Sequence, residues 1–179
     1  MPQARVMLQP FRPDQDTATF ALTGLVERIG DRLSLAFELT GPIHRLRLPS
    51  VVTHPERRQG LWEDTCFECF IGAQTASAYW EFNFSPAGHW NVYHFDDYRQ
   101  GMHPEAAFDG LPMEMLPMQE AMRLTVDIDL KKLKLEGRPI RLALSAVLVS
   151  ATGEKSYWAL VHGGDKPDFH HPVGFGLEL

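Results

Sequence analysis

Alternation of apolar and polar residues over short runs is the feature that most constrains how this chain can fold. In "RLSLAFEL" (32–39) and "PIRLALSAVLVS" (139–150), apolar side chains recur at every second position, which gives an extended backbone one apolar face. Turn residues close these runs, as "IGD" does before the first and "ATGEK" after the second. The two apolar faces comprise Leu33, Leu35, Phe37, Leu39, Ile140, Leu142, Leu144 and Leu148.

Helical periodicity is nearly absent. The one helix-like piece, "DLKKLKL" (129–135), is long enough for only a turn or two, and the 13 prolines are scattered at the ends of the runs. We therefore expect one all-β domain over residues 1–179, an antiparallel β-sandwich of two packed sheets of immunoglobulin or jelly-roll type. The residues predicted to be buried are Phe67, Cys69, Trp80, Phe82, Phe84, Leu142, Leu144 and Trp158.

The charge and composition restrict the partners. A formal net charge of −6 and no run of consecutive basic residues longer than Arg57-Arg58 argue against a nucleic acid or an anionic membrane surface as the partner. No apolar run approaches the roughly 20 residues of a membrane helix, and the first residues lack the apolar segment of a secretory signal. We expect a cytoplasmic protein with a small-molecule ligand.

The only two cysteines, Cys66 and Cys69, form a C-x-x-C pair in "LWEDTCFECFIG" (61–72). In a strand they point to opposite faces, with Glu68 on the side of Cys66. A thioredoxin-like site needs both thiols at the start of a helix, and a structural zinc site needs a second ligand pair. We therefore interpret Cys69 as a small core residue and Glu68, an acid within an apolar strand, as the informative position.

A second run, "YWEFNFS" (79–85), repeats this pattern. One face is entirely aromatic and should lie in the core, whereas the other carries an acid, an amide and a phenol. If this strand lies beside the first, as consecutive runs often do, their polar residues form one patch. The patch is either a ligand site or a solvated outer face, and its residues are Trp62, Glu68, Tyr79, Glu81 and Asn83.

The hairpin around "SPAG" (85–88) has two possible registers. Pairing of Phe84 with Trp90 places Trp90 in the core and Tyr93 beside Glu81, and a shift by one residue reverses both. The sequence leaves the two registers open.

Arg99 and several histidines near the C-terminus could have either a structural or a functional role. Arg99 could bind a ligand carboxylate or sugar hydroxyls, or pair with Asp96 or Asp97. Histidines near strand ends are more often structural hydrogen-bonding groups than metal ligands, so we expect neither a metal nor a cofactor. The residues concerned are His162, Asp168, His170 and His171.

The loop "HGGDKPDFHHP" (162–172) is expected to form one wall of the binding site through Asp168, Phe169 and His170. Glycines free the backbone after an apolar strand, and a proline fixes the chain before Asp168. In the alternative interpretation, Phe169 closes the end of the sandwich and the histidines cap neighbouring backbone carbonyls.

Three segments, "LWEDTCFECFIG", "YWEFNFSPAGHWNVYHFDDYRQGM" and "SYWALVHGGDKPDFHHPVGFGLEL", resemble the DOMON-like domains that are similar to family 9 carbohydrate-binding modules, in a bacterial branch. In the sugar-binding relatives a tryptophan precedes a strand that contains an acid, and Trp62 and Glu68 match these positions. A second stacking tryptophan near the C-terminus is not evident here. The superfamily also includes haem b cytochromes, but Met102 and His103 are neighbours and do not reach opposite faces of one iron.

These observations predict a non-catalytic module that binds a saccharide or a sugar-containing small molecule. The expected ligand-binding residues are Trp62, Glu68, Tyr79, Glu81, Asn83, Tyr93, Arg99, Asp168, Phe169 and His170. The alternatives are a protein-interaction or homodimerisation surface, a haem-binding domain, and a glycoside hydrolase that uses Glu68 and Glu81.

Overall fold

The computed structural model describes residues 3–179, whose regular structure is almost entirely β. The strands are β1 (Gln3–Pro10), β2 (Ala21–Ile29), β3 (Arg32–Thr40), β4 (Cys66–Ala73), β5 (Tyr79–Phe84), β6 (Trp90–Phe95), β7 (His103–Pro104), β8 (Met113–Met118), β9 (Ala121–Asp129), β10 (Ile140–Val149), β11 (Lys155–Ala159) and β12 (Leu177–Glu178). The short 3-10 helices are η1 (Thr17–Thr19), η2 (Ile43–Arg45), η3 (Leu61–Glu63), η4 (Leu130–Leu133) and η5 (Pro172–Gly174). Within residues 3–179, no helix has the length and apolar character needed to cross a membrane.

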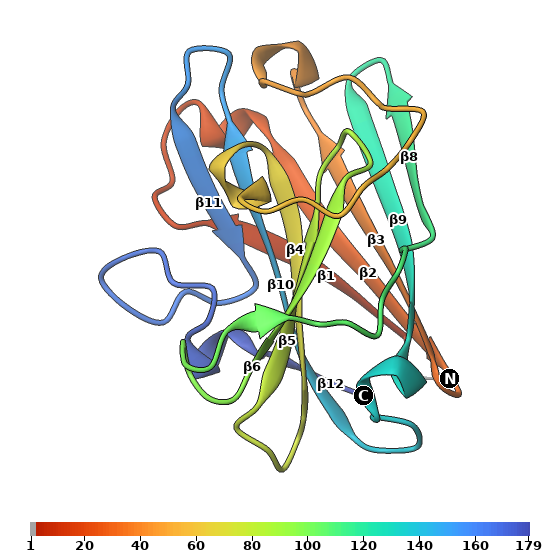
Figure 1. The fold of residues 1–179 in the computed structure, drawn as a ribbon. Helices are drawn as coiled ribbons and strands as arrows, with labels where there is room; N and C mark the ends of the chain where they lie inside the picture. Colours follow the sequence, from red (N-terminus) through yellow and green to blue (C-terminus); the bar gives the residue numbers. More distant parts are fainter. Residues whose placement is uncertain (1–2) are drawn as a thin grey trace.

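The strands pair antiparallel in one continuous sheet, in the order β7-β6-β5-β4-β10-β11-β1-β2-β3-β9-β8 with β12 beside β10 (Figure 1). Strand β1 joins the two halves, because residues 3–8 pair with β2 whereas Gln9 and Pro10 pair with β11. The predicted antiparallel all-β class is confirmed. In place of two separate sheets, however, the structure has a single sheet that curls on itself through β1.

The main core fills the space between the two halves of the curled sheet. Phe37 of β3 contacts Phe67 of β4 and Phe84 of β5, with ring centroids 5.2 Å and 6.3 Å apart. Each fully buried side chain of this size contributes about 1.5–3 kcal/mol by leaving water. The contacts across the sheet therefore come from the alternating residues that the sequence marked as apolar.

The predicted core is confirmed except at one position. The residues found buried are Phe67, Cys69, Phe82, Phe84, Leu142, Leu144 and Trp158. The prediction for Trp80 is wrong, because this side chain is only half-buried at the margin of the core. Its indole Nε1 donates a hydrogen bond to Glu105 Oε2 at 2.9 Å, and the ring must reach the surface to make that bond.

The two halves of the sheet differ in how their outer faces are covered. Strands β2 and β9 alternate between buried and half-buried residues, whereas β4 is buried over its whole length. A second, smaller cluster covers the outer side of β4, β5 and β6. We call it the aromatic cluster, and it consists of Phe70, Tyr79, Tyr93, Phe95 and Ala143, with Phe169 and Phe175 packed against it.

The cysteines lie on opposite sides of β4, as predicted. Cys69 belongs to the main core, and Cys66 Sγ lies 3.8 Å from Asn83 Oδ1 on the outer side. Both side chains are buried, and the strand holds them apart. A redox site with converging thiols is therefore not formed.

The hairpin β5–β6 adopts one of the two registers considered. Phe84 pairs with Trp90, and Glu81 pairs with Tyr93. Trp90 is consequently in the main core and Tyr93 on the outer side, beside the acid. This register places Glu81 and Tyr93 on the face that bears the candidate site.

Candidate functional site

Two glutamates on adjacent strands point to the same outer side of the sheet. In the pairing of β4 with β5, Glu68 lies opposite Asn83 and Glu81 lies opposite Phe70, so that the two acids are diagonal neighbours. They are only 3% and 5% exposed, and both line a cavity of about 390 Å³. The predicted grouping of Glu68, Glu81 and Asn83 on one face is confirmed, and we call Glu68 and Glu81 the acid pair.

Burial controls the protonation of the acid pair. It raises the pKa of Glu81 to about 7, against the opposing effects of a 2.8 Å hydrogen bond from Asn83 Nδ2 and of the positive charge of Arg99. Burial, followed by the charge of Glu81, raises the pKa of Glu68 well above its usual value. The Ser145 hydroxyl, 3.5 Å from Glu68 Oε2, offsets this only in part. At neutral pH the pair therefore holds a bound proton.

His170 lies against the acid pair without forming an ion pair. Its Nε2 is 3.6 Å from Glu81 Oε2, but burial and then the charge of Arg99 lower the pKa of His170 to about 4. The imidazole is therefore neutral at pH 7. The Tyr79 hydroxyl accepts from the backbone N–H of Arg99 at 3.2 Å and lies 2.8 Å from His170 Nδ1. Donation by the Tyr79 hydroxyl to Nδ1 gives the phenol proton an acceptor, and it is compatible with the histidine tautomer whose N–H is on Nε2, facing Glu81.

Arg99 is held by the loop after β11. Its Nη2 and Nε donate to Asp168 Oδ1 at 2.7 Å and 3.2 Å, and the Tyr98 hydroxyl donates to the other oxygen of Asp168. Partial burial raises the pKa of Asp168, but the bonds from Tyr98 and Arg99 outweigh it and lower the pKa below its usual value. Of the alternatives for Arg99, the carboxylate it binds is thus Asp168, and not Asp96 or Asp97.

Aromatic side chains form much of the remaining lining. Trp62 follows the left-handed turn at Gly60, is 36% exposed, and packs edge-on against Tyr93 at 5.9 Å between ring centroids. Phe169 and Tyr157 line the same cavity, with their ring centroids 6.1 Å apart. The cavity therefore offers apolar ring faces beside the buried carboxyls.

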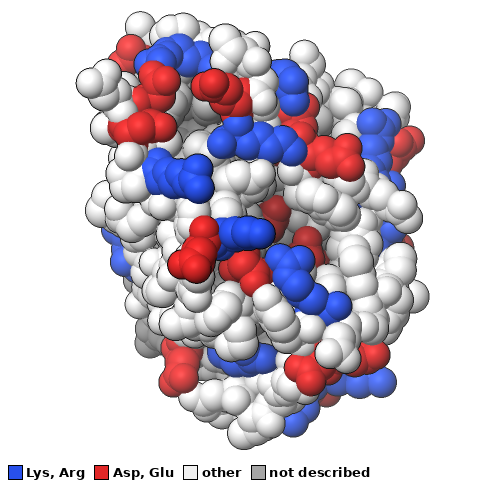
Figure 2. All heavy atoms as spheres, turned by 90° about the vertical axis from the view of Figure 1, so that its left-hand side faces the viewer, with Lys and Arg blue, Asp and Glu red and all other residues white. Residues whose placement is uncertain are grey.

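The loop after β11 lines the cavity with Pro167, Phe169 and His170, whereas Asp168, which was also predicted for this wall, does not line it and instead binds Arg99. Figure 2 shows the face of the molecule that carries β11 and this loop, with basic and acidic side chains close together around its centre. Of the neighbouring histidines, His162 contacts a backbone carbonyl, as in the alternative interpretation, whereas His171 contacts a backbone N–H. His171 Nδ1 accepts from the N–H of Val173, and His162 Nε2 lies 2.8 Å from the carbonyl oxygen of Gln9.

The structure divides the ten expected residues into two groups. Those that line the cavity are Trp62, Glu68, Glu81, Arg99, Phe169 and His170. The others contact the lining residues from behind or beside them, and they are Tyr79, Asn83, Tyr93 and Asp168.

Sequence reasoning missed several lining residues, namely Phe95, Met102, Val147, Lys155, Tyr157 and Pro167. Two of them had a usable signal. Tyr157 precedes Trp158, and the predicted burial of Trp158 in the main core places Tyr157 on the opposite face of β11. Lys155 lies two residues before Tyr157 on β11 and shares its face by the same signal. The other four lie on loops or on strands that are buried on both faces, where alternation does not indicate which side chains reach the cavity.

The histidines and acids of residues 3–179 form no group of three or more that could hold a metal ion. Met102 lines the cavity, whereas His103 belongs to β7, where its ring lies 4.9 Å from that of His94. Met102 and His103, although adjacent in the sequence, therefore have different surroundings in the structure.

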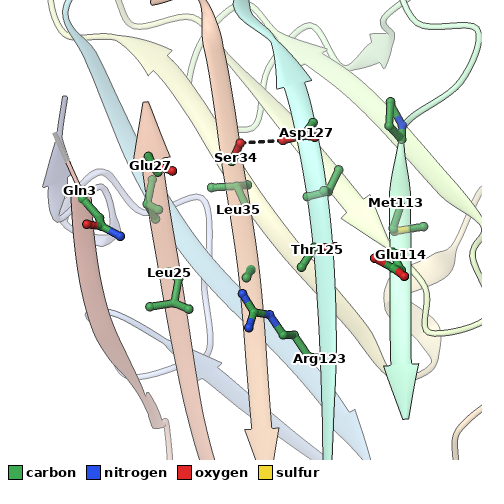
Figure 3. Close-up of a pocket in the computed structure, with 14 residues that line it drawn as sticks. Gln3, Leu25, Glu27, Ser34, Leu35, Met113, Glu114, Arg123, Thr125 and Asp127 are labelled. Carbon is green, nitrogen blue, oxygen red and sulfur yellow. Dashed lines mark hydrogen bonds between the residues drawn. The ribbon is translucent and has the colours of Figure 1, made fainter. Parts of the chain in front are cut away.

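A second hollow, of about 520 Å³, follows the outer face of β2, β3, β9 and β8 (Figure 3). Some of its polar side chains are paired, since Ser34 Oγ donates to Asp127 Oδ1 at 2.6 Å and Arg123 lies 3.3 Å from Glu38. The bond from Arg32 is the main cause that lowers the pKa of Asp127. Since no aromatic side chain lines this hollow, we take the cavity with the acid pair as the candidate site.

The curled antiparallel sheet has the fold of family 9 carbohydrate-binding modules. A candidate carbohydrate-binding protein from Bacteroides uniformis ATCC 8492 matches with a TM-score of 0.66 and 14% identity, over 96% of this chain and 83% of that one. A family 9 module from Caldicellulosiruptor kristjanssonii matches with a TM-score of 0.54 and 10% identity, over 90% of this chain. Its structures with cellotriose and with glucose are covered to 74% and 76%. No family model and no curated protein matches the sequence. At these identities the likeness establishes the fold, as the sequence resemblance implied.

Proposed function

We propose that this chain is a non-catalytic binding module for a saccharide or a sugar-containing small molecule, with the cavity at the acid pair as its site. The observation that carries the proposal is the combination, in one cavity, of a partly exposed Trp62 with two buried carboxyls. The apolar C–H face of a sugar ring packs on an aromatic side chain, and its hydroxyls need buried polar partners. The cavity volume of about 390 Å³ falls within the usual range for small-molecule sites.

The lining residues are of two kinds, which would contact different parts of such a ligand. Trp62 and Phe169 supply apolar platforms, and Glu68, Glu81, Arg99 and His170 supply hydrogen-bonding groups. The residues behind them position these groups, as Asn83 does for Glu81 and Asp168 for Arg99. The fold is shared with a module whose structures contain cellotriose and glucose, which supports the same class of ligand here.

Tryptophan fluorescence tests the site directly. Of the four tryptophans, Trp62 is the one that lines the cavity, so titration with glucose, cellobiose or cellotriose should change the emission through Trp62. Trp62→Phe should abolish the change, and Trp80→Phe, at a half-buried position outside the cavity, should retain it. Calorimetry on the same titrations gives the affinity. Absence of binding to every member of a broad glycan array would falsify the proposal.

A glycoside hydrolase that uses the acid pair is the enzymatic alternative to a binding module, and a separate assay must distinguish the two. A hydrolase keeps one acid protonated and the other ionised, and burial raises the pKa of both Glu68 and Glu81, so an activity assay and not the pKa values must separate the two functions. We expect no release of nitrophenol from aryl glycosides. Release that disappears in both Glu68→Gln and Glu81→Gln would make the protein an enzyme.

A protein-interaction role is tested by oligomeric state. The partly exposed Trp62 also suits a protein interface. Light scattering after size-exclusion chromatography should show a monomer with and without ligand. A dimer that dissociates in Trp62→Ala would assign the face to self-association.

A further inference from the structure

The acid pair has no cationic partner among residues 3–179. His170 Nε2 lies 3.6 Å from Glu81 Oε2, and the imidazole is neutral at pH 7. Arg99 is engaged by Asp168 through two N–H groups. Arg99 and Lys155 line the cavity but form no ion pair with either acid, so that an ionised pair has no permanent cation of these residues in direct contact with it.

The other groups around the pair are neutral at pH 7. Ser145 of β10 and Asn83 of β5 each contact one carboxyl oxygen. The Tyr79 hydroxyl is bonded to His170, and the Tyr93 hydroxyl accepts from Asn91 Nδ2 at 2.8 Å. Burial raises the pKa of both phenols, and it raises that of the buried Cys66 thiol as well. None of these groups can therefore balance the charge of the acid pair.

We propose that the saccharide selected by this cavity carries a basic nitrogen, as glucosamine and its oligosaccharides do, and that its ammonium group binds between Glu68 and Glu81. This inference rests on the proposed function of the cavity. An ammonium group is a compact cation with three donors, so it can bond to both carboxyls at once. A neutral sugar offers hydroxyls but no positive charge that would favour an ionised pair.

The proposal predicts that binding of a cationic sugar releases protons from the acid pair, which can be measured. At neutral or slightly acidic pH the pair holds a bound proton, because burial raises the pKa of both acids. An ammonium group favours the ionised carboxylate. Binding of the cationic sugar therefore releases a proton from the pair to solvent, whereas binding of the same ring without its charge does not.

Isothermal titration calorimetry at about pH 6, where an ordinary amine is cationic, tests the proposal with glucosamine, N-acetylglucosamine and glucose. Two buffers of different ionisation enthalpy report the protons released. We expect glucosamine to bind at least about tenfold more tightly than either neutral sugar, as a charge-assisted bond allows, and to release a proton. Glu68→Gln and Glu81→Gln should each remove the preference, and the exposed Glu136→Gln should leave it unchanged.

The outcomes separate this inference from the function on which it rests. Equal or tighter binding of glucose, with no proton release by glucosamine, overturns the basic-ligand inference and leaves a neutral-saccharide module. Failure of every saccharide to bind overturns both. A preference for glucosamine that survives in Glu68→Gln and Glu81→Gln places the cation elsewhere and also overturns the inference.

Discussion

The Nδ1 atom of His170 lies 2.8 Å from the hydroxyl of Tyr79, and this contact connects the loop after β11 to the strand beneath the cavity. The same hydroxyl accepts from the backbone N–H of Arg99. One phenol therefore positions two segments of the cavity, which are far apart in the sequence.

Tyr79→Phe removes both contacts and leaves two partly buried polar groups without a partner. We expect a loss of about 1–3 kcal/mol in the free energy of unfolding, and a fall in Tm of about 2–4 °C for each kcal/mol. Tyr157→Phe is the matched control, because the Tyr157 hydroxyl makes no hydrogen bond within residues 3–179. Equal losses in the two variants would show that the contact contributes nothing.

Protonation of Glu81 should make stability depend on pH. Folding raises the pKa of Glu81 from 4.5 to about 7, so its contribution is complete below about pH 4.5 and is lost as the pH rises through 7. The size of the loss is on the order of 3 kcal/mol. His170 acts in the opposite sense, because its pKa falls from 6.5 to about 4 and its contribution is lost as the pH falls through that range.

A difference between variants isolates the part due to Glu81. The stability of Glu81→Gln minus that of the wild type should rise between about pH 5 and pH 8, because the contribution of His170 is present in both proteins. Chemical denaturation at several pH values measures it. The same difference for the exposed Glu136→Gln should stay flat, and a flat line for Glu81→Gln would contradict the raised pKa.

Arg57 should be a major structural residue outside the site. Its guanidinium donates to Asn91 Oδ1 at 2.8 Å and to the carbonyl oxygens of Glu105 and Phe108 at 2.9 Å and 2.6 Å. It also lies 4.5 Å over the ring of Trp90. Arg57→Lys cannot reproduce this planar set of bonds, and we expect a loss of about 2–4 kcal/mol on unfolding by denaturant.

The adjacent Arg58 provides the control for this substitution. Its side chain is half-exposed, and its one ion pair is with Glu56 at 3.0 Å. Arg58→Lys should change stability by no more than about 0.5 kcal/mol. Similar losses in the two variants would assign the effect to arginine content and not to the bonds of Arg57.

The thiols should be unreactive in the folded protein. Burial raises the pKa of Cys66 and of Cys69 well above the usual value, and the thiolate is the reactive form. A disulfide-exchange reagent should therefore titrate no thiol in native protein and both thiols in denaturant. Rapid reaction of either cysteine without denaturant would show that β4 opens.

Phe169 and Phe175 should respond differently to truncation. Phe169 lines the cavity, whereas Phe175 packs on the aromatic cluster and beneath the Arg141 guanidinium, 4.2 Å from its ring centroid. Phe169→Ala should weaken saccharide binding by about two- to tenfold with a change in Tm of only a few degrees. Phe175→Ala should lower Tm more and leave the affinity intact, and the reverse result would make Phe169 a structural plug.

The sequence predicted the strands more securely than their assembly. Alternation identified β3 and β10 because one face of each packs in the main core, and consecutive order was enough to place Glu68 beside Glu81. Neither alternation nor consecutive order could predict that β1 pairs with both β2 and β11, because pairing between strands that are distant in the sequence leaves no local pattern. The partner of Arg99 was missed for the same reason, since Asp168 is brought to it only by the fold.

The double role of β1 has a consequence for how the protein is made. Its residues 3–8 can pair with β2 soon after synthesis, but Gln9 and Pro10 must wait for β11, and the cavity wall at residues 167–170 comes later still. Pairings between such distant segments are slow to form, and a chain emerging from the ribosome exposes unpaired strand edges until they do. The acid pair is thus synthesised about a hundred residues before the loop that encloses it, so its carboxyls stay in water until that loop has been made.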